Sequence, residues 1–182
     1  MAASAPSNLE HADILVIGAG IAGAAIAYHL APNARVILLE RESQPGYHAT
    51  GRSAALYSET YGNAAVRAIT TASRPFYMSP PDGFAEHPLL TPRGSMIVGG
   101  PQHEEKLRRT CAEMRRLVAS VEWLDAAQIA ARVPVLRPEA ATWAVYEPDA
   151  MDMDVHAIHQ GFLRGARAGG GRLVCGAEVR AL

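Results

Sequence analysis

The fold is decided by the stretch Asp13-Ile-Leu-Val-Ile-Gly18-Ala-Gly20-Ile-Ala-Gly23, which an alanine-rich segment and then Arg35-Val-Ile-Leu-Leu-Glu40 follow. An apolar run ends abruptly in glycines, as is typical of a buried parallel strand before a tight turn. The glycines have the spacing G-x-G-x-x-G, and a second apolar run follows the alanine-rich segment. The stretch therefore predicts a strand, a helix and a second strand in that order.

Each glycine in this pattern has a physical role in binding a dinucleotide. Gly18 permits the turn, Gly20 lets a diphosphate approach the backbone, and Gly23 lets the helix lie close to the strand. The helix that follows directs its free N–H groups and the positive end of its dipole at the phosphates. The second strand ends at Glu40, whose carboxylate can accept hydrogen bonds from ribose hydroxyls. The whole arrangement predicts an adenine dinucleotide site.

The same stretch has a second interpretation, because residues 14–31 are mostly apolar and could be read as a membrane span or signal anchor. Three glycines and His29 lie within it, no basic residue precedes it, and Asp13 flanks its start. These features disfavour a transmembrane segment. Residues 1–11 are mostly small and polar, and we expect them to form a disordered lead.

Composition narrows the class of protein. The chain has 182 residues, enough for one good core or slightly more. Seventeen basic and eighteen acidic residues give a net charge of −1, which does not favour nucleic acid or an anionic membrane as a partner. Cys111 and Cys175 lie far apart without metal-ligand spacing, and no secretory signal is evident. We therefore expect reduced thiols, no metal site and a cytoplasmic location.

The rest of the chain mixes helical and strand patterns. Turn signals at Pro45-Gly46 and Thr50-Gly51 predict a polar loop over residues 41–55, placed to wrap the cofactor. Residues 86–92 are expected to form an irregular crossing. The predicted helices span residues 63–78, 101–120, 125–133 and 152–168, and the predicted strands span residues 94–99, 122–124, 142–146, 172–176 and 178–182.

These elements predict an α/β fold with three parts. Residues 12–90 form the first part of a Rossmann-like domain, in which helices flank a parallel sheet. Residues 91–149 do not repeat its strand–helix–strand order and predict an inserted α+β segment for substrate binding. Residues 150–182 return to the first domain. A sheet of so few strands is incomplete at its C-terminal side, and we expect the chain to be the N-terminal portion of a longer protein.

Six stretches of the chain have the pattern of a known family. They are Ile17-Gly-Ala-Gly-Ile-Ala-Gly23, Leu38-Leu-Glu-Arg41, Gly46-Tyr-His-Ala-Thr-Gly-Arg-Ser-Ala-Ala55, Val66-Arg-Ala-Ile-Thr-Thr-Ala-Ser-Arg74, Gly83-Phe-Ala-Glu-His-Pro-Leu-Leu90 and His159-Gln-Gly-Phe-Leu-Arg-Gly165. These stretches resemble FAD-dependent oxidoreductases of the D-amino-acid oxidase superfamily. Within it, the sequence is most similar to the D-arginine dehydrogenase type of bacterial D-amino-acid dehydrogenases. The similarity extends over nearly all of residues 12–182, and the loop after Glu40 favours FAD over a nicotinamide cofactor.

The resemblance implies a set of contacts with FAD. The glycine motif would contact the diphosphate, the acid after the second strand the adenosine ribose, and the residue after it the adenine. The following loop would run along the diphosphate and the isoalloxazine ring, and a late residue would pair its backbone with the adenine. The implied diphosphate residues are Gly18, Gly20, Ala22 and Gly23, the ribose residue is Glu40, and the residue beside the adenine is Arg41. The loop residues are Ala49, Thr50, Gly51, Arg52, Ser53, Ala54, Ala55 and Leu56, and the late residue is Val179.

The resemblance also implies a reaction and a substrate pocket. The family reaction oxidises a D-amino acid by hydride transfer from its α-carbon to flavin N5, and the imine product hydrolyses to a 2-oxo acid and ammonia. Tyr61 matches a tyrosine on a mobile loop that closes over the substrate; an ordinary half-buried tyrosine is the alternative. His48 and His87 are candidate polar residues near the site, although structural roles are the alternative for both. The electron acceptor, oxygen or a quinone-type carrier, stays open.

Two positions depart from the D-arginine pattern. Leu56 stands where that type has an active-site histidine, and Ser95 stands where an acidic residue would receive a cationic side chain. Loss of that carboxylate removes the partner that makes a guanidinium tolerable in a closed site. We therefore expect neutral or apolar D-amino acids as substrates. Oxidation of glycine, sarcosine or glycerol phosphate, or an inactive truncated FAD-domain fragment, are the alternatives.

Overall fold

The computed structural model describes residues 11–181 and contains two compact units, which we describe separately. Unit 1 comprises the described residues up to Ser53, Pro81–His87 and the described residues from Val155 onward, and unit 2 comprises Ala54–Pro80 and Pro88–Asp154. The expected lead at residues 1–11 lies outside the described residues except for its last residue. The roles that the sequence assigns to residues 12–90, 91–149 and 150–182 stay predictions.

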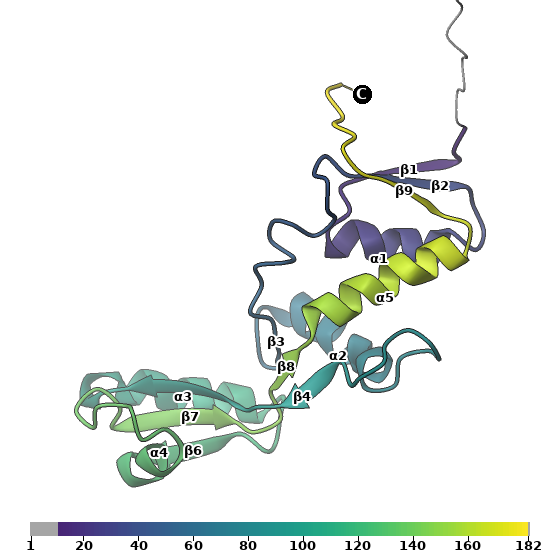
Figure 1. Cartoon of the computed structure of the whole chain (residues 1–182). Helices are drawn as coiled ribbons and strands as arrows, with labels where there is room; N and C mark the ends of the chain where they lie inside the picture. Colours follow the sequence, from purple (N-terminus) through teal and green to yellow (C-terminus); the bar gives the residue numbers. More distant parts are fainter. Residues whose placement is uncertain (1–10, 182) are drawn as a thin grey trace, which may run out of the picture. The chain divides into compact units, whose positions relative to one another are not determined.

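Unit 1 is built on a parallel three-stranded sheet, as the sequence predicts. Strand β2 (Val36–Leu39) lies between β1 (Ile14–Ile17) and β9 (Arg172–Val174). Helices α1 (Ile21–Leu30) and α5 (Val155–Ala168) lie side by side against one face of this sheet (Figure 1). The buried residues of α1 are the small Gly23, Ala24 and Ala27, and Gly165 of α5 lies against the ring of Tyr28.

The core of unit 1 lies between these helices and β2. From α1 it receives Ala24 and Ala27, and from β2 the buried side chains of Val36 and Leu38. Phe162 of α5 completes it and makes an edge-to-face contact with Phe84, with ring centroids 5.2 Å apart. The opposite side of β1 is open, since Leu15 and Ile17 are 51% and 52% exposed.

Unit 2 contains two antiparallel three-stranded sheets. The smaller one has the order β3 (Leu56–Tyr57), β8 (Met151–Met153) and β4 (Leu90–Pro92). The larger one has the order β5 (Ser95–Gly99), β7 (Trp143–Glu147) and β6 (Glu122–Asp125). Helix α2 (Ala64–Met78) begins at Asn63, whose side-chain oxygen accepts a hydrogen bond from Val66 N, and none of its residues is buried.

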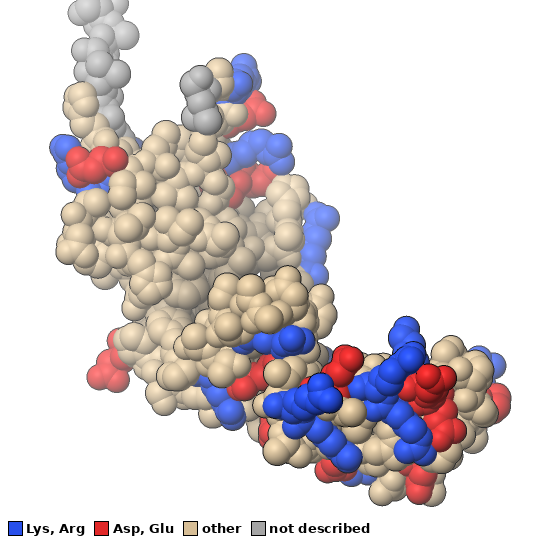
Figure 2. Space-filling model, turned by 180° about the vertical axis from the view of Figure 1, so that it is seen from behind, with Lys and Arg blue, Asp and Glu red and all other residues tan. Residues whose placement is uncertain are grey.

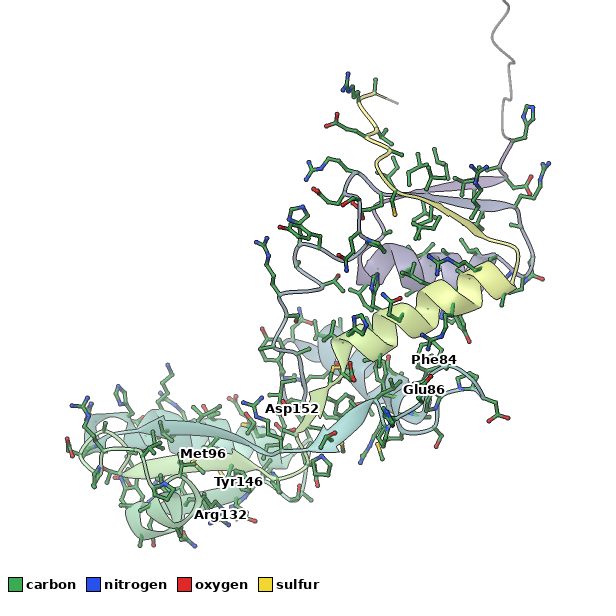
Figure 3. The ribbon with its side chains drawn as sticks, in the orientation of Figure 1. Phe84, Glu86, Met96, Arg132, Tyr146 and Asp152 are labelled. Atoms are coloured by element: carbon green, nitrogen blue, oxygen red, sulfur yellow. The ribbon has the colours of Figure 1, made fainter. Side chains whose placement is uncertain are left out.

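The larger sheet is covered on both faces because the side chains of β7 alternate. Val145 packs with helix α3 (Glu104–Arg115), and Ala144 packs with helix α4 (Ala126–Arg132). A capping box starts α4, in which Asp125 and Gln128 exchange hydrogen bonds. Figure 3 shows Met96, Tyr146 and Arg132 together on the α4 side, where the Arg132 guanidinium lies 5.2 Å from the ring centroid of Tyr146.

The exposed side of α3 carries charges of both signs, as expected for a solvated face. Glu104 pairs with Arg108 at 2.8 Å and Glu105 with Arg109 at 3.1 Å, both at i,i+4 spacing. Figure 2 shows basic and acidic side chains intermixed over this part of unit 2. The Arg108 guanidinium also lies over the ring of Trp123, 4.5 Å from the ring centroid. Arg108 therefore makes a cation–π contact in addition to its ion pair.

Two predictions of helix boundaries are wrong. The helix predicted over residues 101–120 begins as a 3-10 turn at Pro101–His103, and α3 ends at Arg115. The backbone changes there to hydrogen bonds three residues back, from Arg116 N to Glu113 O and from Leu117 N to Met114 O. The Arg115 guanidinium also donates to Val121 O at 2.8 Å, where the chain turns toward β6. Residues 152–154 do not start a helix, because Met151–Met153 pair with strands on both sides as β8.

Two predictions about the sheets also need correction. Leu90–Pro92 is strand β4 rather than an irregular crossing, and Pro92 is tolerated because β4 lies at the edge of its sheet. Residues 178–181, the described part of the last predicted strand, form no strand. Gly176 turns the chain with φ +67°, and Ala177 N donates to Glu40 O, so the backbone follows the loop after β2 instead of pairing as a strand.

Candidate functional site

The glycine turn between β1 and α1 has the geometry that its sequence predicts. Gly18 has φ +93°, a left-handed conformation that favours glycine. A Cβ atom added to Gly23 would lie 1.9 Å from Gly18 O, so only glycine lets α1 approach the turn this closely. Two of the three glycines are therefore required by the backbone itself, before any ligand is considered.

The N–H groups of the turn are divided between protein acceptors and open space. Gly18 N donates to Leu39 O, and Ala19 N donates to Glu40 Oε2. Ile21 N donates to Thr50 Oγ1, and Ala24 N donates to Gly20 O. Among residues 11–181, the N–H groups of Gly20, Ala22 and Gly23 have no hydrogen-bond acceptor. Polar backbone groups need partners, and a diphosphate would supply acceptor oxygens at this helix start.

Glu40 is fixed at the end of β2 by backbone donors. Its Oε2 accepts from Ala19 N at 2.9 Å, and its Oε1 accepts from Glu42 N at 3.0 Å. A carboxylate offers about four lone-pair positions, so both oxygens retain capacity for ribose hydroxyls. The carboxylate thus both shapes the turn and faces the place where a ribose would bind.

Thr50 in the polar loop also contacts the turn. Its hydroxyl oxygen accepts from Ile21 N at 2.9 Å, and it would lie 3.2 Å from a Cβ atom on Gly20. Gly46 has φ +76°, and Gly51 N donates to Gly46 O at 2.7 Å, which folds the loop back on itself. The loop that the sequence places around the cofactor is therefore attached to the start of α1.

His159 of α5 is a supporting residue to which the sequence analysis assigns no role. The side chain is buried, and its Nε2 lies 2.8 Å from Ala19 O. The ring also contacts the loop, since a Cβ atom on Gly46 would lie 2.9 Å from its Cε1. Its signals in the sequence are a polar residue next to Ile158 on the apolar side of a helix and its place at the start of a stretch that carries the family resemblance.

His48 and Arg41 meet at a surface carboxylate. His48 Nε2 lies 2.8 Å and Arg41 NH2 lies 3.0 Å from Glu42 Oε1. The hydrogen bond from His48 and then that from Arg41 lower the pKa of Glu42 below its usual range. His48 is exposed and has this carboxylate as a partner; its catalytic role stays a prediction, as does that of the exposed His87.

The remaining predicted cofactor residues lie in different parts of the chain. Ala49, Arg52 and Ser53 belong to the loop in unit 1, and Val179 lies in the segment after Gly176. Ala54, Ala55 and Leu56 belong to unit 2. Ala55 O accepts from Met153 N at 3.1 Å, directly before β3.

In unit 2, the two positions that depart from the D-arginine pattern each lie opposite a carboxylate. Leu56 pairs with Asp152 in the smaller sheet, and Ser95 pairs with Glu147 in the larger one. Residues directly opposite in an antiparallel pair project to the same face. Asp152, labelled in Figure 3, is bound to Arg93 at 2.7 Å.

Tyr61 follows β3 and is 76% exposed. In β3 itself, the Tyr57 hydroxyl donates to Glu59 Oε1 at 2.7 Å. Burial raises the pKa of the Tyr57 phenol well above its usual range, and the hydrogen bond with Glu59 raises it further. Tyr57 is therefore neutral and structural, whereas the side chain of Tyr61 is free for contact with a ligand.

The fold and the glycine turn define a dinucleotide-binding class of protein, and comparison with known proteins gives the family. Residues 13–182 match the model of the DAO family, described as FAD dependent oxidoreductase. The chain belongs to this family, which confirms FAD as the predicted cofactor and the α/β fold class. The open N–H groups of the turn and the carboxylate of Glu40 fit the diphosphate and the ribose of this group.

Individual relatives are similar over part of their length. An FAD-dependent oxidoreductase domain-containing protein 1 homolog from Drosophila melanogaster is 30% identical over 74% of this chain and 27% of its own. Sarcosine oxidase subunit beta from Rhodobacter capsulatus is 22% identical over 94% of this chain and 47% of its own. The chain thus spans less than half the length of these curated relatives.

Solved structures show the same fold. Glycine oxidase from Geobacillus kaustophilus superposes with a TM-score of 0.80 and 20% identity, over 92% of this chain and 47% of that one. L-alpha-glycerophosphate oxidase from Mycoplasma pneumoniae, with FAD bound, gives a TM-score of 0.78 and 14% identity over 94% and 46%. Among the described residues, no helix has both the length and the apolar character needed to span a membrane.

Proposed function

We propose that this chain supplies the FAD cradle and part of the substrate pocket for the oxidative deamination of D-amino acids to 2-oxo acids and ammonia. The observation that carries the FAD part is the set of open N–H groups at Gly20, Ala22 and Gly23 beside Glu40. The D-amino-acid part rests on the resemblance of residues 46–55 and 83–90 to D-arginine-type dehydrogenases.

FAD, when bound, supplies the acceptor for the two electrons removed from the substrate. The chain's own residues then bind and orient. The glycine turn holds the diphosphate, Glu40 the ribose, and Thr50 ties the loop of residues 46–53 to the same helix start. Tyr61 is proposed to cover the substrate and exclude water from the reacting α-carbon.

The proposed substrates are neutral or apolar. Leu56 offers no charge, and the carboxylates opposite Leu56 and Ser95 already have partners: Asp152 binds Arg93, and Glu147 accepts two hydroxyl hydrogen bonds. Asp152 is therefore not left to receive a guanidinium or ammonium group, and Ser95 itself supplies no charge; burying an unpaired cation is costly. D-Arg and D-Lys are therefore disfavoured.

Other reactions on the same cradle form the second candidate. The solved structures with this fold include glycine oxidase and L-alpha-glycerophosphate oxidase, and one curated relative is sarcosine oxidase subunit beta. These names favour glycine, sarcosine or glycerol phosphate as alternative substrates. A third candidate is a fragment without turnover, because the chain spans about half of each solved chain.

The test is purification of the chain, addition of FAD and a screen of substrates by dye reduction. The screen contains D-Ala, D-Leu, D-Met, D-Phe, D-Arg, D-Lys, glycine, sarcosine and glycerol 3-phosphate. The proposal expects flavin absorbance bands and the highest kcat/KM with a neutral D-amino acid. The highest value with D-Arg would contradict the substrate class, and the highest with glycine or sarcosine would favour the second candidate. A colourless protein would favour the third.

A further inference from the structure

Glu147 is the most deeply buried carboxylate described in unit 2, and it is bound to the loop that carries Tyr61. We propose that Glu147 is a positioning residue that fixes the loop of residues 58–62, so that Tyr61 acts by rotation of its side chain on a fixed backbone. The inference rests on the proposed role of Tyr61. The resemblance implies that the whole loop moves, whereas in this proposal only the side chain of Tyr61 moves.

The anchor consists of two hydroxyl groups on one carboxylate oxygen. Glu147 is the last residue of β7 and is 2% exposed. Its Oε2 accepts from Ser58 Oγ at 2.7 Å and from Thr60 Oγ1 at 2.7 Å. Ser58 Oγ in turn accepts from Thr60 N at 3.4 Å. The backbone on the N-terminal side of Tyr61 is thus bound to a strand nearly ninety residues further along the chain.

The chemistry of this anchor makes it difficult to release. Glu147 Oε2 is the acceptor in both hydrogen bonds, and both hydroxyls donate to it. No Lys or Arg within residues 11–181 pairs with Glu147. A buried carboxylate without a cation depends on its remaining donors, and movement of the loop would remove both of them together.

The C-terminal side of Tyr61 is fixed independently. Gly62 has φ +81° and turns the chain into α2, where a Cβ atom on it would lie 2.9 Å from Val66. Gly62 O accepts from Arg67 NH1 at 2.9 Å, and Asn63 caps the helix. Tyr61 is therefore an exposed side chain between two bound segments, and its side-chain torsions are its free degrees of motion.

A third link holds the middle of the loop to α2. Glu59 accepts from the Tyr57 hydroxyl at 2.7 Å and from Thr71 Oγ1 at 3.3 Å, and it pairs with Arg74 at 3.4 Å. The residues on both sides of Glu59 bind Glu147, while Glu59 itself binds the helix. Alternate residues of the loop are therefore tied to two different elements of unit 2.

The experiment compares hydrogen exchange and chymotrypsin cleavage in the purified chain and three variants. Glu147→Leu removes the acceptor, Glu147→Gln keeps an amide oxygen that accepts both hydroxyls, and Thr60→Val removes one donor. Ser120→Ala is the matched control, because it removes a hydroxyl–carboxylate hydrogen bond to Asp149 at an exposed place in the same unit.

The anchor predicts that exchange in residues 58–62 rises roughly tenfold or more in Glu147→Leu and about fivefold in Thr60→Val, with less than about threefold change in Glu147→Gln and Ser120→Ala. Chymotrypsin should cut after Tyr61 rapidly only in Glu147→Leu, although this tyrosine is exposed in every form. Unchanged exchange in Glu147→Leu, or a wild-type loop that exchanges as fast as an unfolded peptide, would overturn the proposal. If Glu147→Leu does not fold, Thr60→Val decides by the same criterion.

This experiment is independent of turnover. Tyr61→Ala keeps the anchor but removes the ring that the proposed function assigns to covering the substrate, so it should lower turnover and leave exchange in residues 58–62 unchanged. A protected loop with no effect of Tyr61→Ala on turnover would support the anchor and count against the role of Tyr61. A loop that exchanges as fast as an unfolded peptide, together with a large loss of turnover in Tyr61→Ala, would count against the anchor and support the role of Tyr61.

Discussion

The imidazole of His159 holds the glycine turn, with its Nε2 2.8 Å from the carbonyl oxygen of Ala19. The contact joins α5 to the turn across 140 residues of sequence. The carbonyl accepts, so the Nε2 atom carries the proton. The same ring lies against Gly46, and it therefore supports both segments that we propose to bind the diphosphate.

Replacement of His159 should weaken the turn and cofactor binding together. His159→Phe keeps an aromatic ring but leaves Ala19 O without its donor, which should cost about 1–3 kcal/mol in the free energy of unfolding. Chemical denaturation measures this, and quenching of FAD fluorescence measures affinity. His156→Phe places the same change at an exposed position of the same helix and should alter neither quantity appreciably.

Removal of the Glu40 carboxylate should lower FAD affinity and also destabilise the protein without FAD. Glu40→Ala leaves the N–H groups of Ala19 and Glu42 without acceptors, and it would lose the proposed contact with the ribose. We expect a Kd for FAD at least about tenfold higher, since hydrogen bonds to charged groups contribute about 1.5–3 kcal/mol. Glu40→Gln should fall between this variant and wild type. Equal affinities in titrations of Glu40→Ala, the exposed control Glu139→Ala and wild type would contradict the assignment.

Gly23→Ala tests the close approach of α1 to the turn. The added Cβ would lie 1.9 Å from Gly18 O, so the helix must shift. Overpacking of this kind costs about 1–3 kcal/mol or more, and we expect a lower melting temperature with loss of flavin absorbance after purification. Ala25→Ser on the same helix adds one atom at a partly exposed position and should retain both properties. Normal flavin binding by Gly23→Ala would refute the geometry.

Restoring a carboxylate at position 95 should shift substrate preference toward cations. Ser95→Glu places an acid on β5 opposite Glu147, at the position where D-arginine-type enzymes have one. The ratio of kcat/KM for D-Arg to that for D-Leu should rise by about tenfold or more, as expected for a newly paired charge in a closed site. Ser120→Glu provides an exposed control with the same change. An unchanged ratio would remove Ser95 from the substrate pocket.

The first strand should respond to acid through Asp13. Its carboxylate binds the guanidinium and the backbone N–H of Arg35, and the hydrogen bond to the side chain is the main reason that the pKa of Asp13 falls from 3.8 to about 2. A pKa lowered in the folded state contributes stability above pH 3.8, and this contribution is lost as the pH falls toward 2. Asp13→Asn should therefore lower the melting temperature at pH 7 and lose its effect near pH 2. Calorimetry over this range, with the exposed Asp82→Asn as control, makes the comparison.

The sequence by itself determined the elements whose signals are local. The run of residues 14–17, the glycine spacing and the acid at position 40 predict β1, the turn, α1 and β2, because each feature acts on its immediate neighbours. The capping box at Asp125 is equally local. FAD also followed from contiguous stretches, since one helix start and one loop carry most of the predicted contacts.

Only the tertiary structure decided which distant groups meet. Residues 90–92 and 151–153 contain no strand signal strong enough alone, and they become strands because they pair with each other. The contacts of His159 with Ala19 and of Glu147 with Ser58 join residues 140 and 89 positions apart. Sheet register and buried hydrogen bonds depend on which segments pack together, and no periodicity of a single segment carries that information.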